Sequence, residues 1–162
     1  MRYADVLWND IAAGDGLCVS FYTQGCPHRC PGCHNPGTWD FKGGKEFPST
    51  LLDELIVKLH AQDIDRSLCI LGGEPLCQEN LFLTTLLVKT VVEKSPNTPI
   101  YIWSGYTLEE LQDMCNPHMD YILKNIDYLI DGRYEEELRD ITLYLRGSSN
   151  QRIHKFDREK KL

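Results

Sequence analysis

The sequence predicts an α/β fold with a mostly parallel sheet. Short, continuously apolar runs at 67–71, 99–103 and 127–131 recur about every 30 residues with a helical pattern between them, which is the length of a βαβ unit. Continuous rather than alternating apolar strands are typical of a parallel sheet that is covered on both faces. The 162 residues suffice for one domain with a core but not for a complete eight-stranded βα barrel.

The first part of the chain predicts a strand, a loop and a helix. The β-rich run at 17–23 leads directly into a loop that is rich in cysteine, and further glycines follow that loop. A helix is expected to begin near Thr50, because Thr50 and Asp53 give a capping-box signal. Apolar residues at helical spacing give this helix one apolar face: Leu52, Leu55, Ile56 and Leu59.

The second part of the chain alternates between the three apolar strands and helices. A helix over about 80–93 follows the first of these strands. A further helix follows the second strand, with Thr107 and Glu110 as its capping pair and Cys115 on its inward face. Asn116–Pro117 is expected to end that helix, because proline does not continue one.

The unusual motifs all follow predicted strands directly. The cysteine loop follows the strand at 17–23, and the motifs Gly-Gly-Glu-Pro, Ser-Gly-Tyr and Asp-Gly-Arg-Tyr follow the other three strands. Ligands of parallel sheets bind beyond the carboxyl ends of the strands. We therefore expect these motifs to meet at one edge of the sheet, where Trp103 and Tyr106 are either cavity residues or ordinary core aromatics.

Composition and charge argue against several functions. A net charge of −7 disfavours a broad nucleic-acid surface, and no run of about 18 apolar residues suggests a membrane span. The acidic residues near the N-terminus do not fit a signal peptide, so a cytoplasmic protein is expected. The basic tail at 151–162 is interpreted as a solvated end, with a docking handle for an acidic partner as the alternative.

Seven cysteines are many for this length, and three of them lie close together with the spacing C-x₃-C-x₂-C: Cys26, Cys30 and Cys33. In a cytosolic chain such a cluster indicates metal binding or catalysis before disulfides. Structural zinc has four ligands, so a zinc site would need His28, His34 or Cys18 as the fourth. With three cysteines, an iron–sulfur cluster keeps one open position. Cys18 and Cys69 lie in apolar runs and are expected in the core.

The cysteine loop resembles that of the radical S-adenosylmethionine superfamily. The wider sequence is similar to one of its families, the anaerobic ribonucleoside-triphosphate reductase activating proteins. The cysteine loop and the Gly-Gly-Glu-Pro motif are shared across much of the superfamily, whereas "RGSSNQR" and the short chain are specific to the family. The matching stretches are "GDG" (14–16), "QGCPHRCPGCHNPGTWDF" (24–41), "LGGEPL" (71–76), "WSGYTLEEL" (103–111), "LIDGRYEEELRD" (129–140) and "LRGSSNQR" (145–152).

The resemblance implies a single radical-S-adenosylmethionine domain over 1–162, folded as a short partial (half) βα barrel. It implies a [4Fe–4S] cluster whose fourth iron binds S-adenosylmethionine. The cluster ligands are then Cys26, Cys30 and Cys33, and the residues placed toward the cosubstrate are Gly32, Cys33, His34, Gly72, Gly73 and Glu74. Gly32 departs from the commonest superfamily pattern, which has an aromatic residue there to pack on adenine.

The resemblance also implies the reaction. One electron, from a donor such as flavodoxin, cleaves S-adenosylmethionine to methionine and a 5′-deoxyadenosyl radical. That radical then takes a hydrogen atom from a backbone glycine of the large subunit of the anaerobic reductase. The alternatives are a related enzyme that activates another glycyl-radical enzyme, a small carbon-skeleton enzyme of the superfamily, and a non-catalytic adaptor stabilised by zinc.

Overall fold

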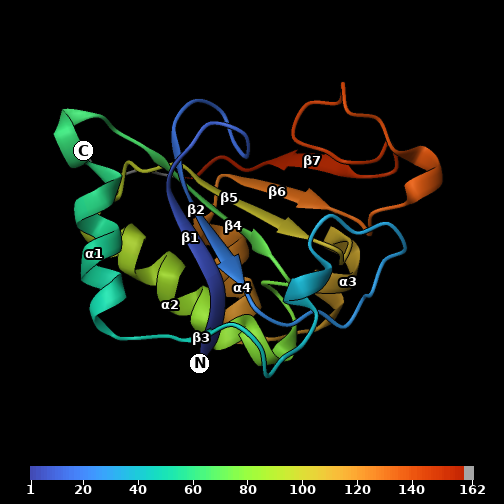
Figure 1. Cartoon of the computed structure of the whole chain (residues 1–162). Coiled ribbons are helices and arrows are strands. Elements are labelled where there is room, and N and C mark those ends of the chain that lie inside the picture. The colour runs from blue at the N-terminus through green and yellow to red at the C-terminus, as the bar shows by residue number, and fades with distance from the viewer. Residues whose placement is uncertain (159–162) are drawn as a thin grey trace.

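The computed structural model describes residues 1–158, and these residues form one sheet of seven strands (Figure 1). The strand order is β3-β1-β2-β4-β5-β6-β7. The strands are β1 (Arg2–Asp10), β2 (Cys18–Thr23), β3 (Lys45–Glu46), β4 (Ser67–Gly72), β5 (Ile100–Ser104), β6 (Tyr128–Asp131) and β7 (Arg152–Lys155).

The four central strands, β2, β4, β5 and β6, are parallel to one another. All of them were predicted, and each begins and ends within one residue of its expected position. The α/β fold with a parallel centre is therefore confirmed. The three outer strands, β1 and β3 on one side of the sheet and β7 on the other, pair antiparallel and were not predicted.

The helices are α1 (Thr50–Leu59), α2 (Gln78–Lys94), α3 (Leu108–Asp113) and α4 (Pro117–Asn125), with short 3₁₀ turns at η1 (Pro36–Thr38), η2 (Ala61–Asp63) and η3 (Glu136–Leu138). Figure 1 shows α1, α2 and α4 on the same side of the sheet. α2 lies beside both α1 and α4, so the three form one layer.

The helix ends agree in part with the expected capping. α1 begins at Thr50 as predicted, but no side chain caps it, so the capping box of Thr50 and Asp53 is wrong. In α3 the predicted box is confirmed, because Thr107 Oγ1 accepts from the Glu110 N–H and the Glu110 carboxylate accepts from the Thr107 N–H. The inward placement of Cys115 is wrong, because the chain turns out of the helix there with a φ of 49° and leaves the thiol exposed.

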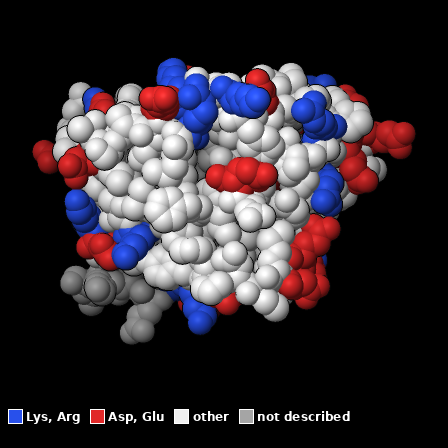
Figure 2. Space-filling view, turned by 90° about the horizontal axis from the view of Figure 1, so that it is seen from below, with Lys and Arg blue, Asp and Glu red and all other residues white. Residues whose placement is uncertain are grey.

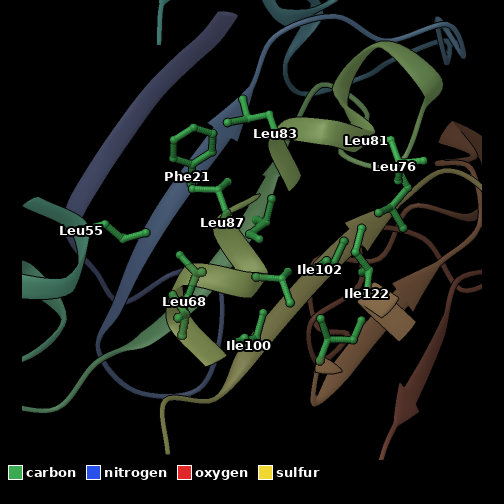
Figure 3. Packing of buried hydrophobic residues seen from close by; sticks show 14 of the residues in the cluster. Phe21, Leu55, Leu68, Leu76, Leu81, Leu83, Leu87, Ile100, Ile102 and Ile122 are labelled. Carbon is green, nitrogen blue, oxygen red and sulfur yellow. The ribbon is translucent and has the colours of Figure 1, made fainter. Parts of the chain in front are cut away.

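The main core lies between the sheet and this helical layer (Figure 3). Every second residue of the central strands points into it, and each fully buried side chain of this kind contributes about 1.5–3 kcal/mol. Its strand residues include Phe21, Leu68, Ile70, Ile100, Ile102 and Leu129, and its helix residues include Leu55, Leu83, Leu87 and Ile122. This packing holds the carboxyl ends of the four strands in a fixed relation.

The other face of the sheet carries a smaller cluster, over which Ala13 and Leu145 pack from loops. Its buried residues are Cys18, Cys69, Tyr101 and Ile130. Cys18 and Cys69 are both fully buried, which confirms them as core residues.

The C-terminal segment is part of the fold. β7 pairs with β6, and the guanidinium of Arg158 lies 3.1 Å from the carboxylate of Asp127, with the Arg158 side chain only 4% exposed. The prediction of a solvated basic tail over 151–162 is therefore wrong as far as Arg158, because strand pairing and buried partners hold the chain. Lys160–Lys161 of that predicted tail lie outside the described residues.

Charges of both signs are spread over the surface. On the face shown in Figure 2, the Lys and Arg side chains of the described residues lie singly or in small groups among acidic and uncharged ones. That face lacks the contiguous basic patch on which nucleic-acid binding depends. None of the helices in residues 1–158 is long and apolar enough to cross a membrane.

Asp131, at the end of β6, is fully buried. Burial alone would raise the pKa of its carboxyl, but hydrogen bonds from Arg152 and from the Leu108 backbone N–H, together with the nearby His154 ring, outweigh burial and lower the pKa. Through hydrogen bonds, Arg152 also lowers the pKa of Glu109 to about 2. Arg152 therefore ties β7 to both β6 and α3.

Replacing Arg152 with Gln is expected to lower the free energy of unfolding by about 1–3 kcal/mol at neutral pH, because Asp131 loses its charged donor. A carboxyl with a lowered pKa stabilises the fold above its unfolded-state pKa of about 4, and the contribution disappears as the pH falls through the folded-state pKa. Urea denaturation should therefore show a weaker loss of stability on acidification for Arg152→Gln than for the unchanged protein. Lys89→Gln, an exposed position on α2, is the control; identical pH dependence in both variants would contradict this role.

Candidate active site

The predicted motifs meet at the carboxyl edge of the parallel strands, around a cavity of about 280 Å³. Gly32 is not on its wall, and a side chain at that position would meet the Glu136 carboxylate instead. Trp103 lines the cavity, whereas Tyr106 contacts the ring of His28. The predicted site residues that line the cavity are Cys26, Cys30, Cys33, His34, Gly72, Gly73 and Glu74.

Backbone hydrogen bonds shape the cysteine loop. The Gly25 N–H donates to the Thr38 carbonyl at 2.6 Å, which closes the loop directly after β2. Within the loop, the Cys33 N–H donates to the Cys30 carbonyl at 3.1 Å and forms a tight turn. The loop therefore folds back on itself and brings its three thiols to one cavity.

Backbone donors lie beside each of the three thiols. The Asn35 N–H donates to Cys33 Sγ at 3.4 Å. Burial raises the pKa of the Cys26 thiol, and a hydrogen bond from the His28 backbone opposes that rise. Burial likewise raises the pKa of the Cys30 thiol, opposed by a backbone hydrogen bond from the segment after β6. Such donors stabilise thiolates, the form in which cysteine binds a metal.

The Glu74 carboxylate joins three segments beneath the cavity. Its Oε1 accepts from the Leu76 N–H at 3.0 Å and from the Ser104 hydroxyl at 2.7 Å. Its Oε2 accepts from the Gly105 N–H at 2.7 Å and lies 3.0 Å from His28 Nε2. A carboxylate has about four acceptor positions, so these contacts use all of them. They link the end of β4, the end of β5 and the cysteine loop.

Gly73 lies where the backbone after β4 touches the cysteine loop. A Cβ at this position would lie 2.4 Å from the carbonyl oxygen of Gly25. The same oxygen accepts from the Glu74 N–H at 2.9 Å, which holds the two segments together. The close approach therefore requires glycine at position 73.

Replacing Gly73 with Ala is expected to lower the free energy of unfolding by about 1–3 kcal/mol, because the added methyl group must push the cysteine loop away from β4. Gly37→Ala is a matched control in the same loop region, since a Cβ there would meet no atom within 4 Å. Urea denaturation of both variants measures the difference. A Gly73→Ala variant as stable as the unchanged protein would contradict the close approach.

The chemistry of the cavity fits an iron–sulfur cluster. Three cysteines without disulfide partners line it, each beside a backbone donor. The indole Nε1–H of Trp39, also a cavity residue, is buried and has no acceptor among the described residues, which suits a bound group with acceptor atoms. Within residues 1–158, no three His, Cys, Asp or Glu side chains are arranged to hold a single metal ion as they stand.

The candidates for a fourth zinc ligand differ in position. His28 has both ring nitrogens engaged, Nε2 with Glu74 and Nδ1 with the Nε–H of Arg133. Cys18 is buried in the cluster on the face of the sheet away from the helices. His34 lines the cavity, as His28 does. Of the three, His34 is therefore the one that an alternative zinc site would use.

Several residues of the cavity wall were not predicted individually. Trp39 and Asn35 come from the cysteine-loop region, and Gly147 and Gln151 come from the segment before β7. Gln151 accepts from the Gly147 N–H at 2.8 Å and donates to the Gly132 carbonyl at 2.9 Å, so it fixes that segment beside the end of β6. The stretches 24–41 and 145–152 contain these residues, but their residue types alone carry no specific signal.

Comparison with known proteins places this site in a family. The model of a 4Fe-4S single cluster domain matches residues 12–154. Its relatives include three proteins named anaerobic ribonucleoside-triphosphate reductase-activating protein. The one from Salmonella typhi is 35% identical over 95% of this chain and 98% of its own length. The one from Vibrio cholerae is 36% identical over 96% of this chain and 99% of its own length. The one from enterobacteria phage T4 is 34% identical over 94% of this chain and 93% of its own length.

These similarities extend over nearly the whole of each chain, so they include the cavity and all the segments that surround it. The cysteine loop and the motifs at the other strand ends fall inside the matched domain. The chain therefore belongs to the family of anaerobic ribonucleoside-triphosphate reductase-activating proteins and contains a 4Fe-4S single cluster domain.

Proposed function

We propose that this chain is a radical S-adenosylmethionine enzyme that generates a glycyl radical on an anaerobic ribonucleoside-triphosphate reductase. The observation that carries the proposal is the arrangement of three thiols, each beside a backbone donor, on the same cavity as the Gly-Gly-Glu-Pro motif. The proposed cluster ligands are Cys26, Cys30 and Cys33.

A bound cluster supplies the electron that cleaves S-adenosylmethionine into methionine and a 5′-deoxyadenosyl radical. The chain itself binds and orients the reactants, because the cofactor carries the difficult chemistry. The backbone of Gly72 and Gly73 lies open to the cavity, and the negative charge of Glu74 beneath it favours the cosubstrate's amino group. His34 and Trp39 form further parts of the wall toward which adenine would bind.

The proposed substrate is a protein segment, the glycine-bearing loop of the reductase's large subunit, which the names of the relatives indicate. Helices cover one face of the sheet and loops cover the other, an arrangement consistent with a short partial βα barrel that is open to a partner. An electron donor such as flavodoxin would reduce the cluster.

Anaerobic electron paramagnetic resonance tests the proposal. The reconstituted protein is reduced, mixed with S-adenosylmethionine and the large reductase subunit, and examined for a glycine-centred doublet. A doublet on a different glycyl-radical enzyme alone would favour the related activating function. A colourless protein that holds one zinc and releases no methionine would contradict the proposal and favour the zinc-stabilised adaptor.

A further inference from the structure

His28 lies between two of the loop thiols in sequence, yet its side chain is only 6% exposed. Its Nε2 lies 3.0 Å from Glu74 Oε2, and the Glu74 side chain is 2% exposed. The ring also packs edge-on against Tyr106, with 4.5 Å between the ring centroids. A polar side chain buried in this way within a cysteine loop connects that loop to the protein beneath it.

The partners of His28 fix which nitrogen carries the proton. Arg133 Nε–H points at His28 Nδ1 at 3.2 Å, and a guanidinium is only ever a donor. Nδ1 must therefore accept, which leaves Nε2–H as the donor to the Glu74 carboxylate. The ring thus bridges a cation and a buried carboxylate.

Gly105 gives independent support for this placement of the ring. A Cβ at position 105 would lie 2.5 Å from His28 Cδ2 and 2.7 Å from His28 Nε2. Because Gly105, directly after β5, has no side chain, the imidazole of His28 occupies the space that a side chain there would fill. At the same place, the Gly105 N–H donates to the oxygen of Glu74 that His28 contacts.

The bridge brings together segments that are far apart in the sequence. Arg133, from the segment after β6, also lies 3.4 Å from Glu110 of α3 and over the ring of Tyr106. His28 alone among the cysteine-loop side chains joins this network through both of its ring nitrogens. Without it, Glu74 Oε2 would lose one of its donors in a buried environment.

We propose that His28 is a positioning residue, which clamps the cysteine loop onto the Glu74 carboxylate and Arg133 and so holds the three thiols over the strand ends before any cluster binds. The clamp acts through hydrogen bonds rather than through metal ligation. It concerns the protein without cluster or nucleotide, so it is tested separately from the proposed radical chemistry.

Hydrogen–deuterium exchange of the cluster-free protein tests the clamp. His28→Leu keeps a side chain of similar size without polar atoms, whereas the amide nitrogen of His28→Gln is able to donate to Glu74 in place of Nε2. Exchange in residues 24–35 is expected to be about tenfold faster for His28→Leu, the factor that corresponds to 1.4 kcal/mol, and within about threefold of the unchanged protein for His28→Gln. His118→Leu, at an exposed histidine on α4, is the control and should change nothing in this loop.

The iron bound per chain after anaerobic reconstitution gives a second measurement. His28→Gln is expected to retain the wild-type iron content, and His28→Leu to lose most of it. Unchanged loop exchange in His28→Leu would overturn the proposal. Equally fast exchange in His28→Leu and His28→Gln would also overturn it, because ring packing rather than hydrogen bonding would then explain the effect. Should His28→Leu fail to fold, tenfold faster loop exchange in His28→Gln would overturn the proposal and near-native exchange would support it.

Discussion

The Cys30→Ala variant is expected to bind no stable cluster and to lose at least about 100-fold in the rate of S-adenosylmethionine cleavage, since metal sites are sensitive even to changes around their ligands. Cys30 is one of only three thiols on the cavity, so no other cysteine of the loop region is available to replace it. Its side chain is partly exposed in a loop, outside both buried clusters. The sheet should therefore remain folded.

The measurements are iron content after anaerobic reconstitution, methionine released under reduction, and far-ultraviolet circular dichroism for the fold. Cys115→Ala is the matched control, because Cys115 is also free but is exposed between α3 and α4. The control should keep its iron and its activity. Full cleavage by Cys30→Ala would rule out Cys30 as a cluster ligand.

The parallel centre of the sheet was predictable because its strands are buried on both faces. The runs that became β4, β5 and β6 are continuously apolar, and the helical pattern between them allows few other folds. The carboxyl ends of these strands follow directly, so the meeting of the motifs at one cavity was also predictable.

The outer antiparallel strands were not predictable in the same way. β1 is partly exposed along most of its length, and β7 has a burial pattern with exposed ends. Two of the four residues of β7, Arg152 and Lys155, are basic, and the basic residues that follow make the segment resemble a solvated tail. Its Arg152 is held by the buried carboxylate of Asp131, a contact between residues 21 positions apart that no local pattern indicates.

The site was predictable for residues whose type carries its own chemistry, such as the three cysteines. Glu74 was placed toward the cosubstrate because the Gly-Gly-Glu-Pro motif resembles that of the superfamily, and its charge suits the cosubstrate's amino group. The structure adds that four donors from the protein already surround this carboxylate. His28 and Trp39 needed tertiary contacts to reveal their positions, because a single histidine or tryptophan in a loop has many possible roles.

Replacing Glu74 with Ala is expected to lower the free energy of unfolding by about 3–5 kcal/mol. The Glu74 side chain is only 2% exposed, so its removal leaves the Leu76 N–H, the Ser104 hydroxyl and the Gly105 N–H without their acceptor. Each buried polar group without a partner costs about 1–3 kcal/mol, and water that enters the new space recovers part of that cost. The cysteine loop should loosen as well, because His28 loses its acceptor.

Urea denaturation of the cluster-free protein measures this effect directly, and Glu54→Ala, at an exposed position on α1, is the control. The stability of Glu74→Gln should lie between those of Glu74→Ala and the unchanged protein. An amide keeps the shape of the carboxylate and one accepting oxygen, but it has a donor group in place of the second accepting oxygen. Because four donors from the protein surround one carboxylate, stability should rise from Glu74→Ala through Glu74→Gln to the unchanged protein. A Glu74→Ala variant that unfolds like the unchanged protein but no longer binds S-adenosylmethionine would instead mean that the carboxylate serves the ligand and not the fold.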